Sequence, residues 1–421
     1  MTSLVFAFEV HQPRRIAVFQ PNGDIKSRNL EKFYFNNGLD KWVFDKVAKR
    51  CYFPTNSILL ELIDNFKHEK RKFKVSFSIS GIFVEMAEKY NKDVLEQFKQ
   101  LVETGNVEII GETYYHSLAS LFEPPQTEFI EQVEMHRELM KDVFGYEPKV
   151  FMNTEMIYNN VIAKVVEDLG FKGIFCEGTE RILGWRSPNY VYVRKFAFPN
   201  DPPPKKRIRV LLRNYRLSDD IGYRFSAKHW DQWPLTADKY AAWLNATPGQ
   251  VINIYMDYET FGEHQWAESG IFWFLKALPY EILKYENLEF ATPNEVIEKY
   301  EPVGEMDVFE FSTASWADME RDVSAWLGNR MQQICYEELK NLEKFVKELN
   351  DPYFLKIWRY LQISDHLYYC CTKWWGDGDV HKYFSCFPTP QDGFVNLISI
   401  ISDFKARVFS ELARKKIQRK K

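Results

Sequence analysis

The first three hundred residues alternate between short apolar runs and longer stretches with helical periodicity. The apolar runs predict strands at Leu4–Glu9, Lys74–Ser80, Val107–Ile110, Val150–Met152, Gly173–Cys176, Ile208–Arg213, Val251–Asp257 and Leu288–Ala291. Several of these runs (VFAF, VFM and INIYM) are apolar at every position, which is typical of parallel strands buried on both faces.

Helical patterns lie between these strands. They predict helices at Thr55–Lys67, Ile82–Thr104, Thr127–Phe144 and Asn159–Leu169. A further helix begins after Ala291 with Thr-Pro-Asn-Glu (Thr292–Glu295), which has the residues of a capping box. Alternating strands and helices over this length predict an α/β fold, either a barrel or a doubly wound sheet.

After about Tyr300 the strand signal fades. Three helices are predicted there, at Ala317–Leu349, Pro352–Trp374 and Gly393–Arg414. We therefore expect a catalytic domain over residues 1–300 and a helical domain over residues 301–421. Consecutive prolines predict a loop at Pro199–Arg209, and the basic tail Ala413–Lys421 is expected to be a frayed, solvated end.

Composition narrows the function classes. A formal charge of −4 over 421 residues provides no general attraction to nucleic acid or to an anionic membrane. No apolar run approaches the roughly 20 residues needed to span a bilayer, and the start, MTSLVFAFEV, lacks the basic region of a signal peptide. Six cysteines without a CxxC pair argue against a zinc cluster or a disulfide framework. We therefore expect a cytoplasmic protein.

Aromatic residues are unusually frequent. They reach 16%, with 34 Phe, 23 Tyr and 12 Trp. Aromatic side chains stack on the faces of sugar rings, which makes carbohydrate a candidate ligand, although composition alone favours a large aromatic core together with an interface.

Polar residues follow several of the apolar strands directly. His11 follows the first strand, Glu112 the third and Glu155 the fourth, while Asp257 and Glu259 follow VINIYM. Because loops at the carboxyl ends of barrel strands converge over one mouth, these side chains predict a shared acidic pocket.

The available residues restrict the chemistry of that pocket. The chain has no GxSxG, no P-loop and no GxGxxG after a strand, and its eight histidines form no HxH or HxxxH pair. We therefore expect no metal and no cofactor. Two carboxyl groups, a histidine and many aromatic residues fit glycoside hydrolysis, in which one carboxyl protonates the leaving oxygen and the other attacks or activates water.

Each candidate also has a simpler explanation. Glu155 could cap or charge the start of a helix near Tyr158, and Asp257 and Glu259, which would face the same side of a strand, could be surface acids. His264 with Trp266 could serve packing alone. Trp316 and Asp318 could mark an ordinary helix entry.

At these residues the sequence resembles glycoside hydrolase family 57, the α-glucan-active family of amylases and 4-α-glucanotransferases. The five short regions of that family have counterparts here in the same order. They are His11-Gln12-Pro13, Gly105–Leu121 (GNVEIIGETYYHSLASL), Phe151–Asn160 (FMNTEMIYNN), Met256–Trp266 (MDYETFGEHQW) and Thr313–Asn329 (TASWADMERDVSAWLGN).

The resemblance implies specific roles. Glu155 would be the nucleophile and Asp257 the general acid/base of a retaining enzyme that cleaves α-1,4-glucosidic bonds. The sugar hydroxyls would be bound by His11, Glu112, Glu259 and His264, and Trp316 and Asp318 would close the cleft. The implied fold is an incomplete (β/α)7 barrel with a helical bundle that contributes to the cleft, so that Leu288–Ala291 becomes an edge strand or no strand.

An α-amylase that acts on α-glucans or maltooligosaccharides is the function expected first. A 4-α-glucanotransferase would use the same site with a glucan acceptor. The aromatic loop Phe225–Pro234 is either an acceptor platform or a lid packed on the barrel. Two further classes are a metal-dependent deacetylase on a similar barrel and a non-catalytic glucan-binding protein. The sequence does not determine the oligomeric state.

Overall fold

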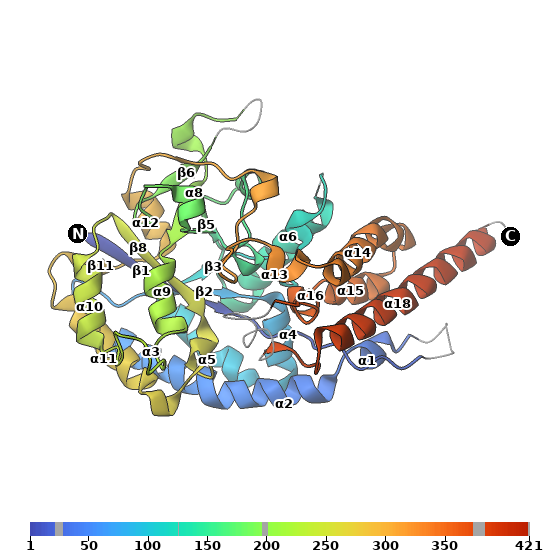
Figure 1. Ribbon diagram of the computed structural model, residues 1–421, viewed down its shortest axis with the longest axis horizontal. Coiled ribbons are helices and arrows are strands. Elements are labelled where there is room, and N and C mark those ends of the chain that lie inside the picture. The colour runs from blue at the N-terminus through green and yellow to red at the C-terminus, as the bar shows by residue number, and fades with distance from the viewer. Residues whose placement is uncertain (22–27, 125, 196–200, 374–383, 420–421) are drawn as a thin grey trace.

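The computed structural model describes residues 1–21, 28–124, 126–195, 201–373 and 384–419. Its centre is a parallel sheet wrapped by helices, with a helical region on one side (Figure 1). The parallel strands are β1 (Thr2–Val10), β2 (Val75–Ile79), β3 (Val107–Ile110), β4 (Val150–Phe151), β5 (Gly173–Glu177), β7 (Arg209–Arg213) and β8 (Val251–Asp257).

These strands close into a barrel. The pairing runs β4–β5–β7–β8–β1–β2–β3, and a parallel bridge between Gly111 and Phe151 joins β3 back to β4. Between β7 and β8 the register contains a single pair, Arg213 with Asn253. The α/β class is therefore confirmed, and of the two architectures left open the closed barrel is the one observed.

Short strands extend this barrel. β11 (Leu288–Phe290) pairs with the first residues of β1 on the edge that continues into β2, so the predicted eighth strand exists. β6 (Tyr192–Arg194) and β12 (Glu305–Met306) were not predicted, because so few residues leave no periodic signal. β6 pairs antiparallel with β7, and β12 pairs with β6, so the sheet reaches beyond residue 300. The division into two domains stays a prediction.

Successive residues of the barrel strands enter different hydrophobic clusters. Val5 and Ala7 of β1 belong to a small cluster with Phe175, Leu211 and Tyr255, which fills the inside of the barrel. Leu4, Phe6 and Phe8 belong to the large cluster shared with the surrounding helices. Since side chains alternate across a strand, every second residue points inward. Both faces are buried, which is why the sequence showed uninterrupted apolar runs.

The helices before residue 300 cover the outside of the barrel, apart from α1 (Leu30–Tyr34), which contacts the helical region through its first and last residues (Figure 1). They are α1, α2 (Asn37–Val47), α3 (Phe53–Asn65), α4 (Gly81–Tyr90), α5 (Lys92–Glu103), α6 (Thr127–Phe144), α7 (Asn160–Asp168), α8 (Glu180–Leu183), α9 (Tyr215–Gly222), α10 (Ala237–Ala246), α11 (Ile271–Leu283) and α12 (Pro293–Lys299). A π-helix, η1 (Ala48–Tyr52), joins α2 to α3. The predicted single helix Ile82–Thr104 is two helices, because the extended backbone of Asn91 (φ −159°) interrupts it.

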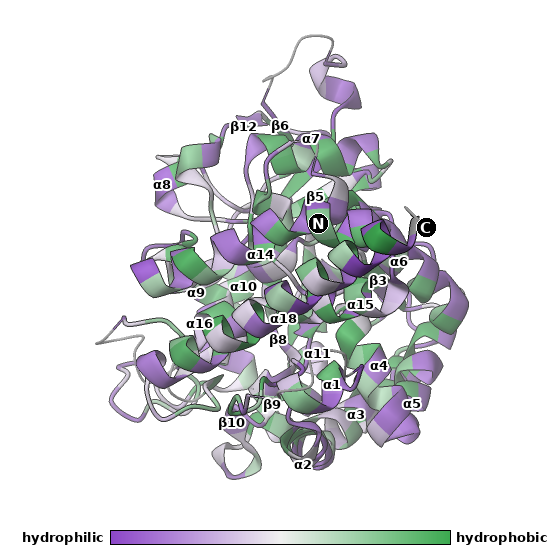
Figure 2. Cartoon of the chain, turned by 90° about the vertical axis from the view of Figure 1, so that its right-hand side faces the viewer, coloured by the Kyte–Doolittle hydropathy of each residue, from purple (hydrophilic) through white to green (hydrophobic). Residues whose placement is uncertain are grey.

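The region after residue 317 is helical, as predicted, but the bounds of its helices differ from the predicted ones. The helices are α13 (Ser324–Leu327), α14 (Arg330–Leu349), α15 (Pro352–Leu361), α16 (Ser364–Tyr368) and α18 (Pro390–Arg419). Residues 317–323 are not helical. The basic tail, expected to fray, remains helical to Arg419, and Lys415 donates a hydrogen bond to the carbonyl of Leu349 on α14. In Figure 2 the outer helices, α18 among them, carry both hydrophilic and hydrophobic segments.

Two smaller predictions are confirmed. Thr292 and Glu295 form a capping box at the start of α12, with both reciprocal hydrogen bonds present. The six cysteines, all within the described residues, form no disulfide. Among the described residues, no helix is both long and apolar enough to cross a bilayer.

Candidate active site

The inward-facing positions change from apolar to ionisable at the carboxyl ends of the barrel strands. On β1, Val5 and Ala7 are followed by Glu9, and on β8, Tyr255 is followed by Asp257. On three other strands, the residue two positions after the last inward-facing apolar residue is also ionisable. These residues are Glu112 after β3, Glu177 on β5 and Arg213 on β7. Alternation along each strand therefore builds a polar layer on top of the apolar barrel interior.

Glu155 lies in a strained turn directly after β4. Glu155 and Met156 adopt left-handed φ angles of 57° and 54°, which are costly for residues other than glycine. The helix that follows, α7, is capped by the side chain of Asn159 and not by Glu155. Helix capping therefore does not explain Glu155, and the strain orients its carboxylate.

The carboxylate of Glu155 is held by groups from distant parts of the chain. The indole Nε1 of Trp316 donates a hydrogen bond to Oε2 at 2.8 Å. The hydroxyl of Ser364 lies 3.3 Å from Oε1, and Nε2 of His116 lies 3.5 Å from the same oxygen. The side chain remains 20% exposed, so it is fixed but accessible.

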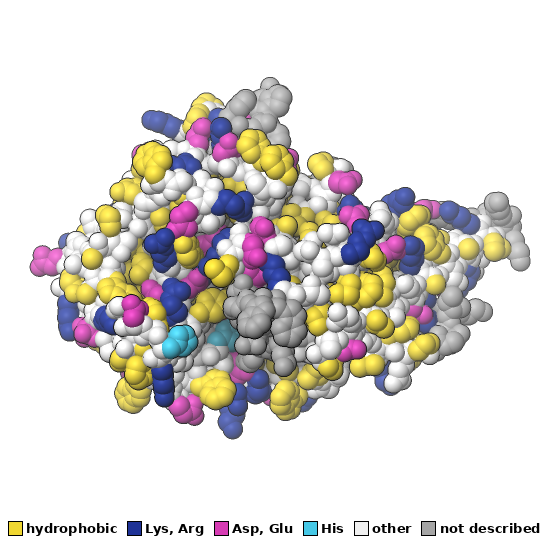
Figure 3. Space-filling view, viewed as in Figure 1, with side chains coloured by type: hydrophobic (Ala, Val, Ile, Leu, Met, Phe, Trp, Pro, Cys, Tyr) yellow, Lys and Arg dark blue, Asp and Glu magenta, His cyan; other side chains and the backbone are white. Residues whose placement is uncertain are grey.

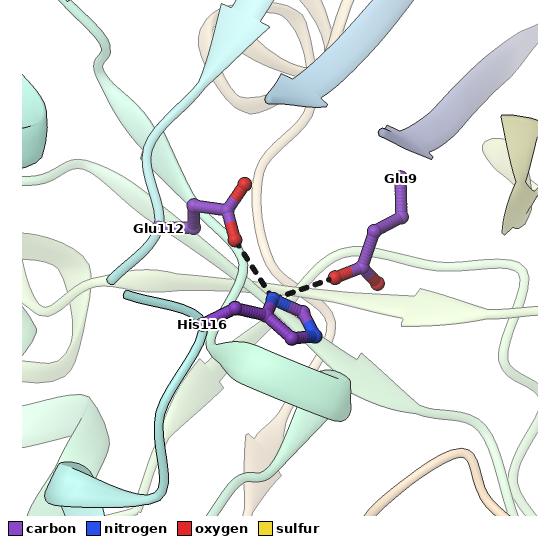
Figure 4. A group of neighbouring side chains, drawn as sticks. All are labelled: Glu9, Glu112 and His116. Atoms are coloured by element: carbon purple, nitrogen blue, oxygen red, sulfur yellow. Dashed lines mark hydrogen bonds and ion pairs between the residues drawn. The ribbon is translucent and has the colours of Figure 1, made fainter. Parts of the chain in front are cut away.

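His116 lies at the centre of a buried charge cluster (Figure 4). Its Nδ1 is 3.1 Å from a carboxylate oxygen of Glu9 and 3.1 Å from one of Glu112. Burial lowers the pKa of His116, but these carboxylates and Glu155 outweigh it and raise the pKa well above its ordinary value. This shift favours the imidazolium form of the ring, whose positive charge offsets the negative charge around Glu155.

The same three residues are the metal-ligand candidates of the described chain. One donor atom each from Glu9, Glu112 and His116 lies within 4.8 Å of the others. The ion pairs through Nδ1 of His116 account for this closeness. The histidines form no HxH or HxxxH pair along the chain, but the rings of His11 and His116 stack with centroids 4.0 Å apart.

Asp257 ends β8 beside this cluster. Burial and, to a smaller extent, the negative charge of Glu155 raise the pKa of Asp257 to about 7, although Arg213 and His116 act in the opposite direction. A carboxyl group with this pKa carries its proton through a large part of the neutral pH range.

Arg213 belongs to a second buried network. It contacts Glu177 at 3.0 Å and Asp219 at 2.6 Å, and Arg321 reaches the same two carboxylates at 3.4 and 2.8 Å. Arg321 also donates a hydrogen bond to the carbonyl of Trp316. The guanidinium carbon of Arg213 lies 5.7 Å from the centre of the Trp316 ring. This network therefore fixes the residue that binds Glu155.

Helix α16 closes one side of the site. The backbone N–H of Ser364 donates a hydrogen bond to the carbonyl of His116 at 2.9 Å. Asp365 lies 3.2 Å from Nε2 of His11, whose Nδ1 lies 2.7 Å from the hydroxyl of Ser80. Burial opposes ionisation of Asp365, but its contacts with His11 outweigh this and lower its pKa to about 2.

Other predicted site residues lie around this centre. Glu259 is not on the strand with Asp257, because β8 ends at Asp257 and a 3₁₀ turn (Tyr258–Thr260) follows. The hydroxyl of Tyr52 donates a hydrogen bond to the buried carboxyl of Glu259. Burial raises the pKa of Glu259 to about 8 against that hydrogen bond.

His264 and Asp318 contact residues outside the charge cluster around His116. Burial lowers the pKa of His264 to about 4, and its ring packs edge-on against Phe384 with centroids 5.5 Å apart. Asp318 has a left-handed φ of 55° and lies 2.8 Å from Lys373. It therefore belongs to a loop, and the helix entry considered from sequence is excluded for Trp316 and Asp318.

The aromatic loop Phe225–Pro234 packs through two of its aromatic side chains and is exposed at most other positions. Phe225 contacts Phe274 with ring centroids 5.2 Å apart, and Trp230 contacts Trp243 at 6.1 Å. Trp233 is 43% exposed. The lid interpretation thus accounts for the first two aromatic residues of the loop.

Sequence reasoning missed several residues of the site. Glu9, Glu177 and Arg213 could have been found by continuing each apolar run in steps of two. His116 was inside a quoted motif without a role. Ser364 and Asp365 left no signal, because nothing local ties a short helix to a strand end more than two hundred residues earlier.

Comparisons with known proteins agree with this arrangement. A model described as "Glycosyl hydrolase family 57" matches residues 5–309. A Methanocaldococcus jannaschii protein, provisionally named alpha-amylase, is 54% identical over 420 residues, which cover 98% of this chain and 86% of that protein.

Solved structures share the fold at low sequence identity. The GH57-type branching enzyme of Pyrococcus horikoshii has a TM-score of 0.61 at 14% identity, covering 97% of this chain and 94% of that chain. The 4-alpha-glucanotransferase of Thermococcus litoralis has a TM-score of 0.60 at 18% identity, covering 87% and 56%. The extent of the family match, together with the arrangement of the five motifs around one site, confirms the resemblance, and the chain belongs to glycosyl hydrolase family 57.

Proposed function

We propose that this glycoside hydrolase is a retaining enzyme of the α-amylase type that cleaves α-1,4-glucosidic bonds in α-glucans. One observation carries the proposal: two carboxyl groups at one barrel mouth have opposite environments. Glu155 accepts a hydrogen bond from Trp316 and lies near the His116 imidazolium, whereas burial raises the pKa of Asp257 to about 7. Such a pair suits an ionised nucleophile and a protonated acid.

In the first step, an oxygen of Glu155 attacks the anomeric carbon and forms a glycosyl ester. The glycosidic C–O bond breaks, and Asp257 gives its proton to the departing oxygen. The hydrogen bond from Trp316 and the charge of His116 hold the Glu155 carboxylate in place for this attack.

In the second step, Asp257 takes a proton from the acceptor hydroxyl. The acceptor oxygen attacks the anomeric carbon, the ester bond breaks, and the Glu155 carboxylate is restored. Water as acceptor gives hydrolysis, while the 4-hydroxyl of another glucan gives transfer. Transfer is the second candidate, because a 4-alpha-glucanotransferase of Thermococcus litoralis is 22% identical over 324 residues.

The covalent intermediate provides a direct test. We expect Asp257→Asn to accumulate a glycosyl adduct on Glu155 when it is treated with α-maltosyl fluoride, because fluoride leaves without a proton and the second step lacks its base. Intact-mass and peptide mass spectrometry measure the adduct. Asp64→Asn, on the exposed face of α3, is the matched control and should turn over without accumulation. An Asp257→Asn enzyme that releases inverted product without an adduct would contradict the retaining mechanism.

A product profile separates hydrolysis from transfer. A maltooligosaccharide of single length is incubated with the wild type, with Glu155→Gln and with the surface control Glu61→Gln on α3, whose side chain is 57% exposed. Shorter chains with a rise in reducing ends indicate an amylase, and longer chains without that rise indicate a transferase. Glu155→Gln should lose at least about a thousandfold in kcat. Comparable turnover by the two variants would refute the role of Glu155.

A further inference from the structure

An exposed aromatic pair lies on the chain segment that leads to Trp316. Phe309 is 51% exposed and Phe311 is 90% exposed. Their rings are parallel to within 3°, with centroids 5.6 Å apart. Figure 3 shows hydrophobic side chains exposed on the face where Figure 1 draws the orange segment between α12 and α13. Contiguous exposed apolar patches mark interaction sites, whereas apolar residues exposed singly need no explanation.

The backbone that carries this pair is fixed at both ends. Before it, the backbone of Val308 and that of Asn160 are joined by a hydrogen bond of 2.8 Å. After it, Ala314 exchanges two backbone hydrogen bonds of 2.9 Å with Tyr158. The side chain of Asn159 also donates to the hydroxyl of Thr313 at 2.9 Å. The rings are therefore presented at a defined place and need little ordering when a ligand binds.

The same segment limits the distance between the pair and the active site. Five residue steps separate Phe311 from Trp316, so their Cα atoms are at most about 18 Å apart. Arg181 on α8 ties the segment down, since it donates hydrogen bonds to the carbonyls of Ser312 at 2.8 Å and Arg321 at 3.0 Å. Trp185, just beyond α8, is 95% exposed.

We propose that Phe309 and Phe311 form a distal subsite that binds glucose units of a long α-glucan, several units away from the bond cleaved at Glu155. This inference rests on the proposed function. The occupant follows from the continuity of the pair with the site through one anchored segment, and from the flat apolar faces that parallel rings offer to pyranose rings. A chain that reaches from the site to the pair gains binding that a short oligosaccharide cannot gain.

The test compares long and short substrates. In Phe309→Ala/Phe311→Ala, we expect KM for amylose to rise about tenfold and amylose retardation in native gels to weaken, while kcat/KM for maltotriose is unchanged. The matched control is Phe409→Ala on α18, which also removes a ring from a partly exposed pair (with Phe345, centroids 4.7 Å apart). Both parameters should stay at wild-type values in the control.

The outcomes separate this subsite from the proposed function. An unchanged KM for amylose in an active double variant overturns the subsite and leaves the function intact. Equal losses on amylose and maltotriose also overturn it, because they indicate damage to the site itself. A wild type that retains amylose in gels through the aromatic pair but cleaves no glucan would refute the function alone. A change in sedimentation with unchanged KM would assign the pair to contacts between copies of the chain and overturn the glucan subsite.

Discussion

At the scale of single residues, the site depends on hydrogen-bond donors that no strand supplies. Trp316 donates to Glu155 at 2.8 Å while its ring packs edge-on against Tyr255, with centroids 5.8 Å apart. Trp316→Phe keeps an aromatic ring at this position and removes the donor together with part of the indole ring. A hydrogen bond to a charged group contributes about 1.5–3 kcal/mol, so we expect kcat to fall about 10- to 100-fold with the melting temperature nearly unchanged. Trp42→Phe, exposed on α2, is the control, and equal activity of the two variants would contradict this role.

The protonation of Asp257 determines how the activity depends on pH. Its pKa of about 7 lies above the ordinary value of 3.8, because burial and the charge of Glu155 favour the protonated form. Since the acid must carry its proton, kcat/KM should fall about tenfold per pH unit above roughly pH 7. A pH–rate profile on maltooligosaccharides measures this limb. Activity that stays constant to pH 9 would show that Asp257 is not the acid.

The raised pKa also has a stability consequence with a definite sign. Between about pH 4 and pH 7 the folded state binds more protons at Asp257 than the unfolded state, so this residue reduces stability as the pH rises. The neutral side chain of Asp257→Asn does not ionise. In thermal melts, the melting temperature of the variant relative to that of the wild type should therefore be higher at pH 8 than at pH 4.

At the scale of elements, α16 couples the helical region to the barrel. Its Asp365 has a pKa of about 2, below the ordinary 3.8, owing to the contacts with His11. A depressed carboxyl pKa stabilises the fold above about pH 4, and the stabilisation is lost as the pH falls toward 2. The free energy of unfolding of Asp365→Asn should thus be about 2 kcal/mol below that of the wild type at pH 6 and almost equal to it at pH 2. Denaturant unfolding at both pH values measures this, with the exposed Asp168→Asn as control; a loss independent of pH would contradict the pairing.

At the scale of the whole molecule, barrel and helical region share one hydrophobic core. Phe6 of β1 and Trp358 of α15 belong to the same cluster. Buried polar contacts cross the boundary as well, for example between Arg359 and Glu128 at 2.8 Å. We therefore expect one cooperative thermal transition, with calorimetric and van't Hoff enthalpies in agreement. Two resolved transitions would instead support independent domains over residues 1–300 and 301–421.

The sequence predicted those elements whose pattern depends only on residues that are neighbours in the chain. The bounds of β3 and β8 and of helix α6 were predicted to the residue, because apolar runs and helical periodicity depend on neighbours in the chain. Predicted helices failed where backbone geometry interrupts a periodic pattern, as at Asn91 and before Ser324. β6 and β12 are stabilised by pairing with other strands, so their residues alone do not identify them.

The sequence by itself determined the α/β class and the placement of Glu155 and Asp257 after apolar strands. It could do so because strand ends are marked by a local change from apolar to polar residues. Only the tertiary structure decided what surrounds these acids. Ser364 lies 209 residues from Glu155, and Trp316 lies 161 residues from it. Barrel closure and the docking of α16 bring them together, and these depend on the packing of the whole chain, which no segment encodes alone.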